Sequence, residues 1–123
     1  MPNYHSPPLL RVLYETDSGV NVLERDSIEI QDFTVKYYNN SMQSDVDSPF
    51  YWIQMDAIYG RILNIYPSDA WENGESFTLI RFNNLTDDLV CKYFEKDDTG
   101  YRYQFLYNGT KLNSDSINRV IRR

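Results

Sequence analysis

Short apolar runs separated by turn residues, spaced at intervals of about ten residues, constrain the fold of this chain more than any other feature. The runs include Leu9 to Tyr14, Phe50 to Met55 and Phe77 to Phe82. The pairs Asn73-Gly74 and Asn108-Gly109, which favour tight turns between strands, fall between such runs. Runs of this length suit strands better than helices. We therefore predict a mainly β fold, built as a small barrel or sandwich.

The aromatic content supports the same fold class. Aromatic residues make up 15% of the 123 residues, and eleven of them are Tyr. Aromatic side chains fit the pleated, half-buried surface of a sheet. The length is that of a single domain. Residues 1–8 are polar and contain three prolines, so we expect a flexible N-terminal arm followed by one β-rich domain over residues 9–123.

Two local patterns refine this expectation. Turn residues between Leu9 and Leu23 predict a β-hairpin there. In the last segment, Ile117, Val120 and Ile121 recur at helical spacing behind possible serine caps. We therefore expect a short C-terminal helix over Ser114 to Arg123, packed on a small SH3-like barrel.

Net charge limits the kinds of partner that this chain is expected to bind, and cysteine content indicates its compartment. The formal net charge is −6, and such a surface repels phosphate backbones and anionic lipid heads. A basic protein or peptide is therefore the favoured partner, and nucleic acid and membrane are disfavoured. Cys91 is the single cysteine, so it cannot form an intrachain disulfide. This points to a reducing, intracellular compartment.

The residues that usually carry catalysis are scarce. His5 is the only histidine, and with Cys91 it provides too few ligands for a zinc site. The sequence shows no glycine-rich phosphate loop and no nucleophile elbow. Its carboxylates fall mainly in turns, as solvated acids do. We expect neither catalysis, a cofactor nor a metal.

The aromatic residues between positions 50 and 71 form the candidate binding surface. Side chains alternate faces along a strand, so Phe50 and Trp52 should share one face and Tyr51 the other. Trp52 lies in an apolar run and is expected in the core, whereas Trp71 lies in a polar loop. Aromatic rings beside acids suit Lys or Arg side chains. The predicted partner-binding residues are Tyr51, Tyr59, Tyr66, Trp71, Asp69 and Glu72.

Ala57 to Tyr66, followed after a loop by Phe77 to Phe82, resembles the SH3-like barrel core of bromo-adjacent homology (BAH) domains. The resemblance implies a chromatin-associated, nuclear module that recognises histone tails or other proteins. It makes Tyr66 and Phe82 the aromatic residues that end two barrel strands. The family continues with aromatic residues and an Arg-Pro-Glu-Glu-like stretch, where this chain reads Asn83 to Asp88. A complete methyl-lysine cage is therefore not implied.

Three functions remain open at this point. The first is a non-enzymatic module that binds a basic peptide or protein through an aromatic and acidic surface. The second is an acidic inhibitor or immunity-type protein that blocks a nucleic-acid enzyme by mimicking phosphate charge. The third is an OB-like barrel that stacks single-stranded nucleic acid on its aromatic rings, which the net charge disfavours.

Overall fold

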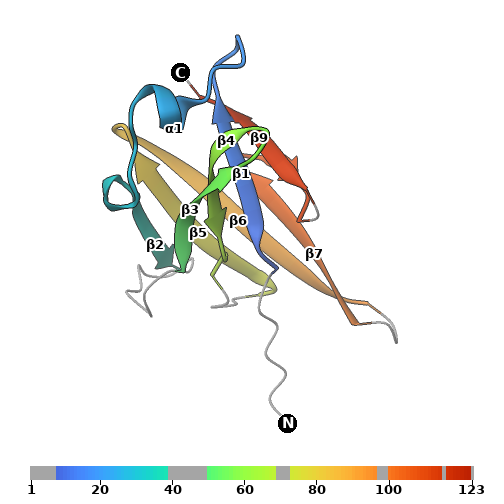
Figure 1. Cartoon of the computed structure of the whole chain (residues 1–123). Helices are drawn as coiled ribbons and strands as arrows, with labels where there is room; N and C mark the ends of the chain where they lie inside the picture. Colours follow the sequence, from blue (N-terminus) through green and yellow to red (C-terminus); the bar gives the residue numbers. More distant parts are fainter. Residues whose placement is uncertain (1–7, 39–49, 69–72, 97–99, 115, 123) are drawn as a thin grey trace.

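The computed structural model of the chain describes residues 8–38, 50–68, 73–96, 100–114 and 116–122 (Figure 1). The elements are mainly strands, with a single turn of α-helix and one 3-10 turn. In chain order they are β1 (Leu10–Glu15), α1 (Val22–Arg25), η1 (Ile30–Asp32), β2 (Thr34–Tyr38), β3 (Tyr51–Asp56), β4 (Gly60–Ile65), β5 (Glu75–Phe82), β6 (Leu85–Lys96), β7 (Gly100–Tyr107), β8 (Thr110–Leu112) and β9 (Ile117–Ile121).

The strands form two sheets that pack face to face (Figure 1). Sheet A has four strands in the order β3-β4-β1-β9, and sheet B has five in the order β2-β5-β6-β7-β8. The predicted mainly β fold is confirmed. The predicted barrel is not what forms, because the described strands make two open sheets with free edges rather than one closed sheet. The pair β1 and β9 is parallel, and the other described pairs are antiparallel.

The core lies between the two sheets and follows the alternation of the strands. In β5, for example, Ile80 and Phe82 are buried and Arg81 between them is exposed. Sheet A contributes Leu63 and Ile65 to the same cluster. The thiol of Cys91 is also buried there, and burial raises its pKa to about 12.

Asparagine and glycine shape the turns between neighbouring strands. Asn83 and Asn84 both have positive φ angles, 52° and 62°, where β5 turns into β6. Asn108 and Gly109, at 48° and 87°, make the equivalent turn between β7 and β8. Two consecutive residues with positive φ match the right-handed twist of the flanking strands. The tight turn predicted from the Asn108-Gly109 pair is therefore observed.

The predicted hairpin over Leu9 to Leu23 is wrong in its second half. After β1 the chain turns at Thr16 to Gly19 and enters α1 instead of a second strand. Asn21 caps this helix, since its side-chain oxygen accepts a hydrogen bond from the amide of Glu24 at 3.0 Å. Val22 and Leu23, whose apolar side chains suggested a strand, are buried residues of this helix.

The predicted C-terminal helix is also wrong, because Ile117–Ile121 form strand β9. Its three apolar residues are β-branched and favour a strand, although their spacing also fits a helix. The tertiary structure decides the outcome, since β9 pairs in parallel with β1 over five residues. The side chain of Asn118 bonds the backbone of Asn113 at 2.8 Å and so holds the strand's entry.

A buried polar cluster ties β9 to sheet B. The hydroxyls of Tyr14 and Tyr107 lie 2.6 Å apart, and Tyr107 donates to the carboxylate of Asp87 at 2.6 Å. Arg122, directly after β9, donates to the carbonyls of Phe82 and Leu85 at 2.9 and 2.7 Å, and its guanidinium lies 3.7 Å from Asp87. Burial raises the pKa of both tyrosines. The end of β9 is thereby anchored to sheet B.

Candidate functional site

An aromatic cluster lies on the outer face of sheet A, away from the core. It consists of Phe50, Trp52 and Tyr66 at the shared end of β3 and β4. The ring centroids of Phe50 and Trp52 are 5.5 Å apart, and those of Phe50 and Tyr66 are 5.8 Å apart. Both pairs meet edge to face, at 87° and 80°. The three rings therefore pack against one another with Phe50 and Tyr66 exposed to solvent. They do not form one flat surface on which a ligand could stack.

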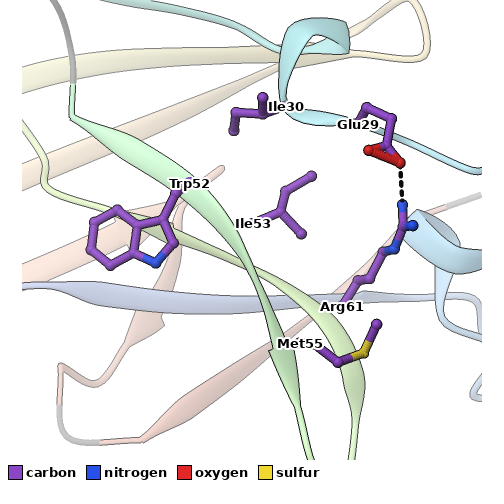
Figure 2. A pocket seen from close by; sticks show the side chains of 6 residues that line it. All are labelled: Glu29, Ile30, Trp52, Ile53, Met55 and Arg61. Carbon is purple, nitrogen blue, oxygen red and sulfur yellow. Dashed lines mark hydrogen bonds and ion pairs between the residues drawn. The ribbon is translucent and has the colours of Figure 1, made fainter.

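Tyr51 and Ile53, which alternate with these residues, point the other way and pack against the core. The predicted division of β3 into two faces is confirmed. The expectation that Trp52 belongs to the core is wrong, since this residue is half-buried on the outer face. Figure 2 shows Trp52 and Ile53 leaving β3 on opposite sides. Alternation alone could not reveal which of the two faces meets sheet B.

The outer edge of β3 has no strand beside it among the residues that the structure describes. The amide of Tyr66 donates to the carbonyl of Phe50 at 3.0 Å, so Phe50 directs its backbone groups toward β4. Because this direction alternates in an antiparallel pair, Tyr51, Ile53 and Met55 direct their N–H and C=O groups away from β4. These groups form a template to which another strand can add.

A groove of about 370 Å³ runs beside this edge, between η1 and β3. Figure 2 shows its lining residues, which are Glu29, Ile30, Trp52, Ile53, Met55 and Arg61. Most of these side chains are apolar, and the side chain of Met55 is 64% exposed. The groove therefore offers apolar contacts next to unpaired backbone groups.

Carboxylates surround the end of the groove where β3 turns into β4. Arg61 donates to the carboxylate of Glu29 at 2.9 Å and to the carbonyl of Ile28 at 2.8 Å. The carboxylate of Glu24 accepts from the backbone amide of Arg61 at 3.2 Å. Asp56 accepts from the amides of Tyr59 and Ile58, which hold its pKa below the usual value. Of these three carboxylates, only Glu29 is paired with the guanidinium of Arg61, whereas Glu24 and Asp56 accept from backbone amides of the turn.

The β3–β4 turn is itself held in place by α1. The side-chain amide of Asn21 donates to the carbonyls of Tyr59 and Arg61 at 2.9 and 3.0 Å. Gly60 has a φ of +83°, and a Cβ there would lie 2.2 Å from a carboxylate oxygen of Glu24. The turn can approach α1 this closely because the residue is glycine. The β3–β4 turn and α1 are therefore held together in a fixed arrangement.

The structure brings only part of the predicted site together. Tyr66 belongs to the aromatic cluster, whereas Tyr51 packs against the core with its ring centroid 6.4 Å from that of Phe33. Tyr59 lies in the β3–β4 turn, with the guanidinium of Arg119 5.6 Å from its ring centroid. The other predicted residues, Asp69, Trp71 and Glu72, lie outside the described residues.

Sequence reasoning missed the side chains contributed from outside the aromatic stretch. Glu29 and Ile30 belong to a 3-10 turn whose position beside β3 depends on the packing of the two sheets. Arg61 was assigned only to a strand. One usable signal was the exposed Met55 at the end of an apolar run. Phe82, which the BAH resemblance makes a strand-ending aromatic, is buried in the core and lies in a different sheet from Tyr66.

Searches for related proteins returned nothing: no family model, no curated protein and no solved structure matches the chain. Within the described part of the chain, no group of three or more His, Cys, Asp or Glu side chains is arranged to hold a metal ion. Nor does that part contain a helix that is long and apolar enough to cross a membrane. The proposals below therefore rest on the geometry of this chain.

Proposed function

We propose that this protein is a non-enzymatic interaction module that binds an extended, basic segment of a partner protein along the free edge of β3. The observation that carries the proposal is the edge of β3, which no described strand pairs with and which lies directly beside an apolar groove. In this mode of recognition, main-chain hydrogen bonds supply affinity and side-chain pockets supply specificity.

The two faces of the added strand would meet different surroundings. Side chains on its inner face would enter the groove beside Ile53 and Met55 and should be apolar. Side chains on its outer face would lie next to Trp52 and Asp56, where a Lys or Arg gains a cation–π contact or an ion pair. The favoured segment therefore alternates apolar and basic residues.

Charge supports a basic partner over an acidic one. The carboxylate of Asp56 lies at one end of the edge and accepts from the backbone amides of Ile58 and Tyr59, whereas the carboxylate of Glu29 is paired with Arg61. The whole chain carries a net charge of −6, which attracts cations during approach. The resemblance of residues 57–82 to BAH domains makes a histone tail one segment of this class, and an intracellular, nuclear location belongs to the same proposal.

The test uses displayed random peptides selected on the wild-type protein and then measured by fluorescence anisotropy. Met55→Pro removes an amide that faces the free edge, at an exposed position and without breaking a bond to β4. The loss of that hydrogen bond, together with the bulk of the proline ring at the edge, should weaken peptide binding by about 1.5 kcal/mol, or roughly tenfold in affinity. Met55→Ala keeps the amide and reports the side chain alone.

Ile121→Pro is the matched control on the opposite edge of sheet A. Arg122 donates its amide to the carbonyl of Glu15 at 2.7 Å, so Ile121 directs its own amide away from β1. This variant should bind the selected peptides like the wild type. Peptides that bind Met55→Pro undiminished, or a selected consensus rich in Asp and Glu, would refute the proposal.

A further inference from the structure

We propose that a second copy of this chain supplies such a basic strand, by presenting the free edge of its β9 to β3 of the first copy. This inference rests on the function proposed above, because it uses the same site. Sheet A has one free edge at β3 and the other at β9 among the described strands. Joining these two edges would continue sheet A from one molecule into the next.

Strand β9 supplies one basic residue on the outer face, where the β3 site favours such a residue. Ile117, Arg119 and Ile121 direct their side chains to the outer face of sheet A, where Arg119 lies 3.5 Å from Glu15 of β1, and they direct their backbone groups away from β1. The side chain of Arg119 is 62% exposed, and Ile121 is 56% exposed. The outer face of the strand thus carries Arg119 between two isoleucines, and its backbone edge is open among the described strands.

The directions of the strands allow this pairing without turning one molecule over. Strand β4 is antiparallel to both β1 and β3, so β3 runs in the same direction as β1. Strand β9 is parallel to β1 and therefore also runs with β3. A second copy placed beside the first in the same orientation would then pair β9 with β3 in parallel.

Matching the outer faces of the two sheets brings complementary side chains together. Arg119 would lie on the same face as Trp52, Gln54 and Asp56 of the neighbouring copy, since all of them point outward from sheet A. Its guanidinium would meet an aromatic ring or a carboxylate. A shift by one residue would turn these side chains to the other face, so the pairing is fixed in steps of two residues.

Both sides of the sandwich also carry apolar side chains at their edges. Beside β9 there is a recess of about 260 Å³, whose lining includes Leu112, Val120 and Ile121. On the opposite side, Met55 and Ile30 are exposed next to the groove. Contact between the two sides would cover these apolar side chains from water, which favours association.

Such a contact joins two different surfaces and leaves one of each unused. The first copy still has a free β9, and the last copy still has a free β3. An assembly of this kind grows beyond a dimer until it closes into a ring or continues as a filament. The inference therefore predicts species larger than dimers in the wild-type protein.

Sedimentation velocity of two edge variants and of their mixture tests the inference. Met55→Pro keeps β9 and blocks β3, whereas Ile121→Pro keeps β3 and blocks β9. Each variant alone should remain monomeric, while the wild type forms larger species as its concentration rises. An equimolar mixture has one functional edge of each kind per pair, and should form dimers and nothing larger. Met55→Lys and Ile121→Lys provide a second pair, because an edge lysine also opposes strand pairing.

The outcomes separate this inference from the proposed function. A synthetic peptide of residues 116–122 should bind Ile121→Pro and bind Met55→Pro at least tenfold more weakly. If peptides bind in this way but the wild type remains monomeric at every concentration, self-association is refuted and the peptide-binding function stands. If the wild type assembles and either proline variant alone assembles equally well, the β3–β9 contact is refuted. If the mixture stays monomeric although the wild type assembles, the contact is refuted as well.

Discussion

Replacing Arg122 should test most sharply how the end of β9 is anchored to sheet B. Its side chain is 4% exposed, lies 3.7 Å from the carboxylate of Asp87, and donates to two carbonyls on sheet B. It also lies over the ring of Phe82, with 3.6 Å between the guanidinium carbon and the ring centroid. Arg122→Ala removes these contacts and leaves Asp87 buried without its cation. Breaking a buried pair in this way costs about 3–5 kcal/mol.

Arg119 on the same strand provides the matched control. It too lies near a carboxylate, at 3.5 Å from Glu15, but its side chain is 62% exposed. Exposed ion pairs contribute about 1 kcal/mol or less, so Arg119→Ala should have a small effect. The assay is urea unfolding of the wild type and both variants, followed by fluorescence. Equal losses in the two variants, or a loss below about 1 kcal/mol for Arg122→Ala, would show that burial does not set the energy of this pair.

Three further predictions concern stability. Burial raises the pKa values of Cys91 and Tyr14, so the native state holds their protons more tightly than the unfolded state does. The free energy of unfolding should therefore be at its full value below about pH 9 and fall above it, by about 1.4 kcal/mol per pH unit for each titrating group. Urea unfolding at several pH values should show that Cys91→Ala reduces this slope. Trp52→Ala should lower the free energy of unfolding by about 1–2 kcal/mol, which is less than the roughly 3–5 kcal/mol expected for a fully buried aromatic residue. A loss of about 3–5 kcal/mol would instead place Trp52 in the core. Gly60→Ala should cost about 1–3 kcal/mol, because φ is positive and the new Cβ meets Glu24; an unchanged melting midpoint would contradict this.

Periodicity along single strands was readable from the sequence because it depends on local geometry. The alternation of Phe50 and Trp52 against Tyr51 follows from the strand itself. Which of those faces becomes the core depends on where sheet B packs, and that is not a local property. The expectation for Trp52 failed for this reason. The prediction of a helix that includes Ile117–Ile121 failed for a similar reason. The pattern of this segment fits a helix as well as a strand, and its pairing with β1 determines that it forms a strand.

By itself, then, the sequence determined the mainly β class, the turn at Asn108-Gly109 and the acidic character of the chain. These follow from residue composition and from backbone preferences over a few positions. Only the tertiary structure decided that the described strands form two open sheets, that β3 and β9 are the edges of sheet A, and that Glu29 and Met55 line the same groove. Each of these depends on contacts between segments far apart in the chain, whose partners no local pattern specifies.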